Sequence, residues 1–304
     1  MEQTNRAGSI WVEPETLQDN SSERLRPGAI YALHRLDEVG YTLRCNTPKL
    51  LDSQKTLLSH EGIEFESDAR DNADWTVASG RDNVLEIHSK DSAVAEGGNW
   101  RELVNRFLFP RRAATRKRTT AETEVEVTLN VDGTGECDID TGLKFFDHML
   151  EQIGRHGLVD LTIRCRGDLE IDEHHTIEDV AITLGEALHE ACLQDKTGIL
   201  RYGFLLAMDE AQAEVALDLS NRPWLVWDVQ FTGQYAGDFP LQMAKHFFHT
   251  LAMNLKATLQ IRAGGENDHH ILESVFKGFA RALRFAITRT ERARNILPSS
   301  KGAL

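Results

Sequence analysis

Alternating hydrophobic and polar residues give the second half of the chain its clearest pattern. From Glu124 to Val131 the two kinds of residue alternate with a period of two, which predicts a half-buried strand. The elements expected next are a second short strand, a helix at 145–153 with apolar residues on one face, a strand at 161–165 and a long helix at 176–193. Residues 122–200 are therefore predicted to form one strand-strand-helix-strand-helix unit.

The same order of elements recurs in residues 201–290. The expected elements are strands at 212–219 and 225–231, a helix at 241–255, a strand at 258–262 and a long helix at 271–288. A repeated order of elements over such a length is the sequence signature of a tandem duplication. We expect a mixed α/β (α+β) fold made of two copies of one unit.

Residues 1–108 show a weaker α/β pattern. Arg26-Pro-Gly opens an amphipathic helix that Gly40 closes, and a short strand follows at 41–45. A basic stretch with a proline begins at Phe109, and we interpret it as a solvated linker rather than as an anion site. The predicted domains are 1–108, a linker at 109–119 and 120–304, which ends in a tail at 291–304.

Composition and charge narrow the class of protein. The 304 residues are enough for two domains, and a net charge of −14 argues against a general nucleic-acid binder. No stretch is long and apolar enough for a membrane helix, and the N-terminus does not resemble a signal peptide. The four cysteines are scattered, which favours reduced thiols in a cytoplasmic protein.

Two short segments, one in each repeat, carry the same pattern of histidine and glutamate. Residues 172–178 read Asp-Glu-His-His-Thr-Ile-Glu and residues 267–273 read Asn-Asp-His-His-Ile-Leu-Glu. On a helix His174 and Glu178 share one face, whereas His175 points about 100° away from them. The second segment repeats this arrangement with His269, Glu273 and His270.

Each segment thus offers one chelating His/Glu pair and one further histidine for another metal ion. The first helix of each repeat adds one more histidine, so that the predicted ligands are His148, His174, His175, Glu178, His246, His269, His270 and Glu273. This set provides two ions with three imidazoles and one carboxylate each, and leaves coordination positions open for catalysis. Such ligands suit Mn, Fe, Zn or Ni, and octahedral geometry favours Mn.

The alternative is that both segments are ordinary helix starts, capped by Asp172 and Asn267. We expect this capping as well, but it leaves the histidines at matched positions unexplained, because histidine is a poor helix former. The six remaining histidines are interpreted as hydrogen-bonded or surface residues: His34, His60, His88, His156, His189 and His249.

Several cationic residues are candidates for binding a phosphate group. Lys277 lies four residues beyond Glu273 and hence on the same helix face. Pro298-Ser-Ser-Lys301 combines hydroxyls with a cation, as an anion site requires. Arg201 and Arg222 complete this set, although each of these residues taken singly is more typical of a solvated surface charge.

Four motifs resemble the imidazoleglycerol-phosphate dehydratase family of histidine biosynthesis, over roughly residues 116–304. They are Gly142-x-x-Phe-Phe-Asp-His-Met-Leu, Asp172-x-His-His-Thr-x-Glu-Asp, Asn267-Asp-His-His-x-x-Glu-Ser and Leu297-Pro-Ser-Ser-Lys-Gly. The resemblance implies that D-erythro-imidazole-glycerol phosphate loses water to give imidazole-acetol phosphate, through an imidazolate stabilised by two metal ions. It also implies helices between two four-stranded sheets, two Mn(II) ions per active site and a 24-subunit homo-oligomer that shares its metal sites between subunits.

The same resemblance assigns roles to individual residues. The ligand positions of the family fall on the eight predicted ligands. Its substrate contacts fall on Glu122, Gln152, Arg201, Arg222, Lys277, Ser299, Ser300 and Lys301. The residues predicted to take part in catalysis are Glu122, His174 and His270, with Glu122 as the acid/base group.

The N-terminal segment resembles, less closely, a histidinol-phosphate phosphatase of the haloacid-dehalogenase class. Asn5 and Ala7 then stand where the two catalytic aspartates of that class belong, Thr47 matches its hydroxyl motif, and Ser79-Gly-Arg81 replaces its late metal motif. Without a carboxylate nucleophile and a magnesium site, phosphoryl transfer has no mechanism. We therefore expect residues 1–108 to be an inactive remnant.

Two other functions compete with a monofunctional dehydratase. One is a bifunctional protein that keeps its phosphatase activity. The other is a metal-binding structural particle, in which the N-terminal domain serves interaction or assembly. The cationic set and Glu122 argue against the second, because a structural shell needs no site for a phosphate group.

Overall fold

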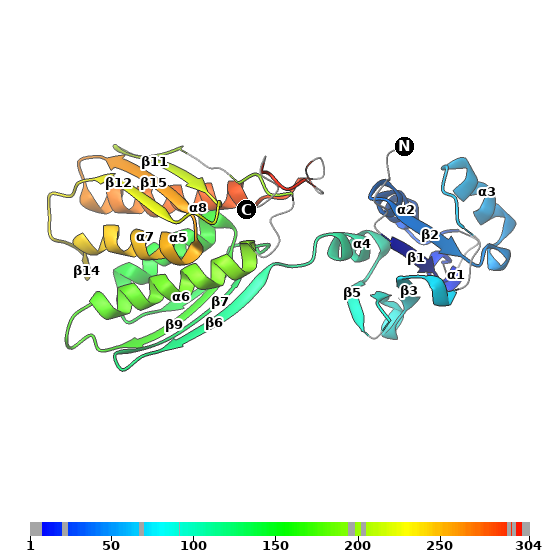
Figure 1. The fold of residues 1–304 in the computed structure, drawn as a ribbon, viewed down its shortest axis with the longest axis horizontal. Coiled ribbons are helices and arrows are strands. Elements are labelled where there is room, and N and C mark those ends of the chain that lie inside the picture. Colours follow the sequence, from blue (N-terminus) through cyan, green and yellow to red (C-terminus); the bar gives the residue numbers. More distant parts are fainter. Residues whose placement is uncertain are drawn as a thin grey trace. The chain divides into compact units, whose positions relative to one another are not determined.

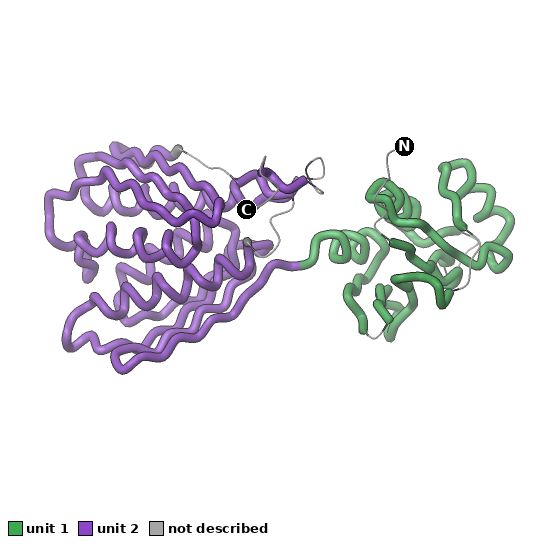
Figure 2. The backbone as a smooth tube through the Cα atoms, in the orientation of Figure 1, with its two compact units in different colours: residues 1–110 green, residues 111–304 purple. Residues whose placement is uncertain are grey.

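The computed structural model describes residues 8–19, 24–66, 70–90, 92–193, 198–201, 205–290, 293 and 296–299. The chain forms two compact units, residues 1–110 and residues 111–304 (Figure 2). In the described part of the chain no helix is long and apolar enough to span a membrane.

The first unit contains a five-stranded sheet with the strand order β2-β1-β3-β4-β5. β1 pairs in parallel with β2 and β3, whereas β4 pairs antiparallel with β3 and β5. The strands are β1 (Gly8–Val12), β2 (Tyr41–Cys45), β3 (Trp75–Ser79), β4 (Leu85–His88) and β5 (Ala93–Gly97). The α-helices are α1 (Pro14–Leu17), α2 (Ala29–Glu38), α3 (Asp52–His60) and α4 (Trp100–Leu108).

The helix and the strand predicted at the start of this unit are confirmed. α2 follows Arg26-Pro-Gly, and Gly40 has a φ of +93°, a conformation that side chains disfavour, immediately before β2. Trp100 on α4 is fully buried, and its indole nitrogen donates a hydrogen bond to the backbone oxygen of Thr16 at 2.8 Å. The unit therefore has a core of its own.

The likeness of this unit to a phosphatase stays a prediction. Asn5 and Ala7 lie outside the described residues, and Thr47 begins a 3₁₀-helix after β2. Ligands of open α/β sheets bind where parallel strands end, and Glu13 occupies that place after β1. Its carboxylate is paired with Arg70 at 2.9 Å.

In the second unit four long helices lie between two four-stranded sheets, as predicted (Figure 1). The first sheet has the order β6-β7-β9-β8 and the second the order β10-β11-β15-β12. The first repeat contains β6 (Ala113–Thr119), β7 (Thr123–Asn130), β8 (Cys137–Asp140), α5 (Lys144–Gly157), β9 (Asp160–Gly167) and α6 (His174–Leu193). The second contains β10 (Leu205–Met208), β11 (Ala211–Asp218), β12 (Trp224–Val229), β13 (Tyr235–Ala236), β14 (Phe239–Pro240), α7 (Gln242–Leu255), β15 (Thr258–Gly264) and α8 (Asp268–Ile287).

The two repeats match in detail. β7 and β11 both alternate between buried and exposed residues, because one face of each strand covers the helices. Leu158 after α5 and Lys256 after α7 have left-handed backbone conformations, with φ of 53° and 55°. Such angles are uncommon for residues with a side chain, so their recurrence at one position indicates a shared backbone path.

The predicted repeat unit is one strand too short, and the predicted linker at 109–119 is wrong in its second part. β6 pairs along its whole length with β7, and β10 takes the same place beside β11. β6 is an edge strand with charged residues and only Ala114 buried, so its composition is that of a solvated segment. Each repeat thus begins with a hairpin.

Arg112, directly before β6, anchors the start of the second unit. Its buried side chain bonds the carboxylate of Asp132 and donates to the backbone oxygen of Ile287 at 2.8 Å. Arg112→Ala is expected to lower the free energy of unfolding by roughly 2–3 kcal/mol, because a buried carbonyl and a carboxylate lose their partner. Urea unfolding measures the change, and the exposed neighbour Arg111→Ala is the control. An equal, small effect of both would contradict this role.

The contact between Arg112 and Asp132 also makes the stability of the fold depend on pH. Burial alone would raise the pKa of this carboxyl, but the hydrogen bond and charge of Arg112 hold the pKa below its ordinary value. A carboxyl with a lowered pKa stabilises the fold above the pKa of the unfolded chain, about 3.9. That stabilisation is lost as the pH falls through the pKa of the folded state.

Candidate metal and substrate site

One group of possible metal ligands joins the first helix of repeat one to the last helix of repeat two. His148 on α5 and His269 on α8 face Glu273, with their Nε2 atoms 3.8 Å and 3.3 Å from its carboxylate oxygens. The possible ligand atoms of the three residues all lie within 4.8 Å of one another. Phe145 packs its ring edge-on against His269, with ring centroids 5.0 Å apart, and so supports the group.

A second group repeats the arrangement with the other two helices. His174 and Glu178 on α6 lie one turn apart, and the Nε2 atom of His174 is 3.4 Å from the carboxylate. His246 on α7 approaches the other oxygen of Glu178 at 3.2 Å. Both groups therefore take a histidine from the first helix of one repeat and a His/Glu pair from the second helix of the other.

The residues present fit a divalent metal ion. Metal–ligand bonds of about 2.0–2.2 Å keep any two ligand atoms within roughly 4.4 Å, close to the 4.8 Å span of each group. The Nε2 atom of His246 is buried and forms no well-aligned hydrogen bond although it lies 3.2 Å from Glu178, as expected for a nitrogen that shares a metal ion with this carboxylate. Two imidazoles and a carboxylate without thiolate are ligands for a transition metal such as manganese.

Helix caps hold these ligands in place, and the capping predicted for Asp172 and Asn267 is confirmed. Their side chains accept hydrogen bonds from the backbone N–H groups of His174 and His269 at 2.8 Å and 2.9 Å. Asp238, between β13 and β14, accepts from the first N–H groups of α5, at 2.6 Å from Lys144. These bonds satisfy free N–H groups and fix the starts of α6, α8 and α5, whereas α7, which carries His246, has no side-chain cap.

His175 and His270 belong to neither group of the described residues. Each ring instead directs its Nδ1 atom at a carboxylate: His175 at Asp168, 3.1 Å away, and His270 at Glu210, 2.9 Å away. These hydrogen bonds raise the pKa of both histidines above the ordinary value. The Nε2 atoms point away from those carboxylates and stay available for another partner.

Glu122 lies in the turn that joins β6 to β7. Its backbone N–H donates to the hydroxyl of Thr120 at 3.2 Å, and this turn is tied to the buried Asp179 on α6 through Thr120, Thr123 and Arg118. The carboxylate is half exposed and lies 3.7 Å from the Nε2 atom of His175. It is therefore free to meet a bound molecule beside a histidine of the predicted ligand set.

Lys277 lies beside the first ligand group. Its ammonium group is 2.8 Å from Glu273, and its neighbour on the other side is the sulfur of Met208 at 3.5 Å. Burial would raise the pKa of Glu273, but the hydrogen bond and charge of Lys277 lower it. Gln152 is buried and directs its amide at His148, one turn earlier on α5.

The other cations gather around Asp218 at the end of β11. Arg201 bonds both oxygens of that carboxylate and donates to the backbone oxygen of Pro298 at 2.9 Å. Arg222 lies 3.8 Å from the same carboxylate. Ser299 follows directly along the tail, whereas Ser300 and Lys301 lie outside the described residues.

Within one chain this cationic cluster is far from the ligand group on α8. Arg201 donates its backbone N–H to Ala286 near the end of α8, whereas His269 lies at the start of that helix. A rise of about 1.5 Å per residue separates the two ends by about 25 Å. The ligand group on α8 and the Arg201 cluster of one chain therefore cannot bind the same small molecule.

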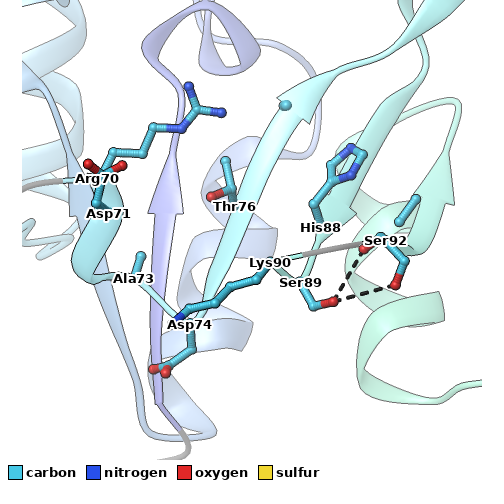
Figure 3. Close-up of a pocket in the computed structure, with 11 residues that line it drawn as sticks. Arg70, Asp71, Ala73, Asp74, Thr76, His88, Ser89, Lys90 and Ser92 are labelled. Atoms are coloured by element: carbon cyan, nitrogen blue, oxygen red, sulfur yellow. Dashed lines mark hydrogen bonds between the residues drawn. The ribbon is translucent and has the colours of Figure 1, made fainter.

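The first unit offers a different concavity, an open hollow lined by residues of β3, β4 and the adjoining loops (Figure 3). Its charges are largely matched within the unit: Arg70 pairs with Glu13, His88 with Glu86 at 2.7 Å, and Asp74 accepts from Ser9 at 2.8 Å. Both groups of possible metal ligands found among the described residues lie in the second unit. The hollow therefore points to no particular chemistry.

Sequence reasoning missed three carboxylates that hold this site together: Asp168, Glu210 and Asp238. A usable signal existed for Glu210, because it precedes β11 as Glu122 precedes β7 in the other repeat. Asp168 and Asp238 lie in loops where the two repeats differ, so comparison of the repeats could not reveal them.

Comparison with known proteins shows similarity to one family over the second unit. The family model of imidazoleglycerol-phosphate dehydratase matches residues 141–283. The dehydratase of Paracoccus denitrificans is 52% identical over 195 residues, which are 64% of this chain and 100% of that protein. The histidine biosynthesis bifunctional protein HisB of Spirosoma linguale is 49% identical over 215 residues, or 71% of this chain.

Solved structures show the same fold. The dehydratase of Staphylococcus aureus aligns with a TM-score of 0.53 at 33% identity, over 59% of this chain and 99% of that one. The Pyrococcus furiosus enzyme, solved in complex with (S)-C348, gives a TM-score of 0.53 at 37% identity, over 62% of this chain and 100% of that one. The chain spans about half the length of the bifunctional relatives, 56% in Spirosoma linguale and 54% in Bacteroides fragilis. The chain covers the whole length of the Paracoccus denitrificans dehydratase at 52% identity. It therefore belongs to the imidazoleglycerol-phosphate dehydratase family.

Proposed function

We propose that the chain is a manganese-dependent imidazoleglycerol-phosphate dehydratase that acts in the cytoplasm as a homo-oligomer. The observation that carries the proposal is the pair of His/His/Glu groups, each built from both repeats, in a chain that covers the whole of a similar dehydratase. Its four cysteines form no disulfide, which agrees with a reducing compartment. The reaction removes one hydrogen and one hydroxyl group from neighbouring carbons of the substrate.

The eight predicted ligands would hold two ions, Mn(II) by our proposal. When bound, these ions supply positive charge that stabilises negative charge on the imidazole ring of the substrate. Glu122 takes the proton from carbon and returns a proton to the departing hydroxyl, because its exposed carboxylate lies beside His175. Lys277, Arg201 and Arg222 with the tail bind and orient the phosphate group.

We further propose that the complete particle contains 24 chains. Neighbouring chains contribute residues to each active site. Within one chain the groups at His148 and His174 hold three ligands each, while His175 and His270 belong to neither. The cluster at Arg201 lies about 25 Å along α8 from His269. A neighbouring chain can supply the missing histidine and the missing phosphate ligands at once.

Chelation tests the proposal directly. Protein stripped of metal is expected to lose dehydration of imidazole-glycerol phosphate, and added Mn(II) is expected to restore it. The mass of the particle, measured by light scattering before and after, shows whether the metal also holds chains together. Full activity in metal-free protein would contradict the metal-dependent mechanism. A chain that stays monomeric with Mn(II) bound would contradict the shared site.

The bifunctional alternative has a separate test. Phosphate release from histidinol phosphate is expected to be absent, because the described part of the first unit brings no three metal-ligating side chains together. Release that survives in a His174→Ala, His270→Ala double variant would show that residues 1–110 keep a phosphatase activity.

A further inference from the structure

His175 and His270, the two histidines outside the ligand groups, each direct the Nδ1 atom at a carboxylate. The Nδ1 atom of His175 lies 3.1 Å and 3.2 Å from the two oxygens of Asp168. The Nδ1 atom of His270 lies 2.9 Å and 3.2 Å from those of Glu210. An ionised carboxylate can only accept, so Nδ1 must carry the hydrogen in both rings. In the neutral ring the lone pair is then on Nε2, the nitrogen that faces outward.

The two carboxylates come from different positions of the duplicated unit. Glu210 ends the turn between β10 and β11, as Glu122 ends the turn between β6 and β7. In the first repeat, however, Glu122 faces the Nε2 side of His175 at 3.7 Å, and Asp168 from the loop after β9 takes the Nδ1 side. The glutamate at this position therefore faces the Nε2 atom of the histidine in the first repeat and the Nδ1 atom in the second.

The loops before the long helices explain this difference. In the first repeat β9 ends at Gly167 and α6 begins at His174, which leaves room for a loop that contains Asp168. In the second repeat β15 ends at Gly264 and α8 begins at Asp268, so that the loop is shorter. There Glu210 also accepts a hydrogen bond from the backbone N–H of Asn267 at 3.1 Å and is held against the helix start.

We propose that Asp168 and Glu210 are positioning residues, which fix the ring orientation and the tautomer of His175 and His270 so that Nε2 binds the metal ion. Because Asp168 performs this task in the first repeat, Glu122 is left free to exchange protons with the substrate. Glu210, its counterpart, is committed to His270 and exchanges none. This inference rests on the proposed function, since it takes both histidines to be metal ligands.

Removal of either carboxylate should weaken metal binding. In Asp168→Asn and Glu210→Gln the amide can donate to Nδ1 as well as accept from it, so it no longer selects one tautomer. Carboxylates that orient metal-binding histidines typically contribute about 10- to 100-fold to metal affinity. We expect a loss of that size for each variant. Glu170→Gln and Glu266→Gln, exposed carboxylates near the same two helix starts, should bind Mn(II) as the unaltered protein does.

The experiment is a Mn(II) titration of the metal-free full-length chain, followed by electron paramagnetic resonance of free Mn(II). Thermal melts of each variant verify that it is folded, and Asp168→Glu, which restores a carboxylate, should recover part of the affinity. Affinities of Asp168→Asn and Glu210→Gln equal to those of the two controls would overturn the inference. His175→Ala separates this from a failure of the proposed function: unchanged Mn(II) binding in that variant would mean that His175 is not a ligand.

Activity at saturating Mn(II) tests the different roles of Glu210 and Glu122. A residue that acts only through metal binding is compensated by more metal, so Glu210→Gln is expected to regain most of its kcat. The kcat of Glu122→Gln should stay lowered under the same conditions. Failure of Glu210→Gln to recover, despite full metal occupancy, would identify Glu210 as a second proton-transfer group and overturn this part of the inference.

Discussion

Glu178→Gln and Glu273→Gln are each expected to lower Mn(II)-supported dehydration at least about 10³-fold. Each substitution removes the only carboxylate from a group of three ligands and leaves two imidazoles. A metal ion contributes several kcal/mol to stabilisation of charge, and about 4 kcal/mol corresponds to a factor of 10³ in rate. Steady-state kinetics measures the loss, and metal analysis should find one ion per chain instead of two.

Glu186→Gln, on the exposed side of α6, is the matched control for Glu178→Gln. This control makes the same change of charge on the same helix, but it leaves the ligand group intact. Retention of both metal ions by Glu178→Gln, or an equal loss in the control, would mean that the group at His174 and His246 is not a metal site.

Glu122→Gln is expected to lower kcat by about 10²- to 10⁴-fold, the usual contribution of a general acid or base. The amide keeps the size of the side chain but cannot exchange a proton. Since the turn is held by Thr120 and Asp179 rather than by the carboxylate, the particle mass and the Mn(II) content should not change. Unchanged kcat would remove Glu122 from the mechanism, and lost metal would make it a structural residue.

The sequence predicted the helices that carry the ligands because their spacing is local. His174 and Glu178 lie one helical turn apart, so any helix through them brings the two side chains together. The capping residues are equally local. Such features depend on backbone geometry over a few residues, which a single sequence records directly.

The composition of each metal group could not be predicted in this way. His148 meets Glu273, and His246 meets Glu178, only because α5 packs on α8 and α6 packs on α7 across the two repeats. The sequence predicted that these histidines are ligands, but not which carboxylate each of them faces. Contacts between helices far apart in the chain follow from the whole fold, not from spacing.

Edge strands were the weakest part of the sequence interpretation. β6 lies at the rim of its sheet, and its charged residues point to solvent and resemble a linker. Asp168 was missed for a related reason, since a loop carboxylate has no periodic pattern. Its importance becomes visible only when the ring of His175 is seen beside it.

A mixed-chain experiment tests the shared active site most directly. One variant carries Glu178→Gln and Glu273→Gln, and the other carries His175→Ala and His270→Ala. Either variant alone should be inactive. After co-expression, a chain with intact ligand groups can meet a neighbour with intact His175 and His270, so dehydration is expected to reappear in the mixed particles. Particles that contain both chains and bind no more metal than the inactive parents would show that each site lies within one chain.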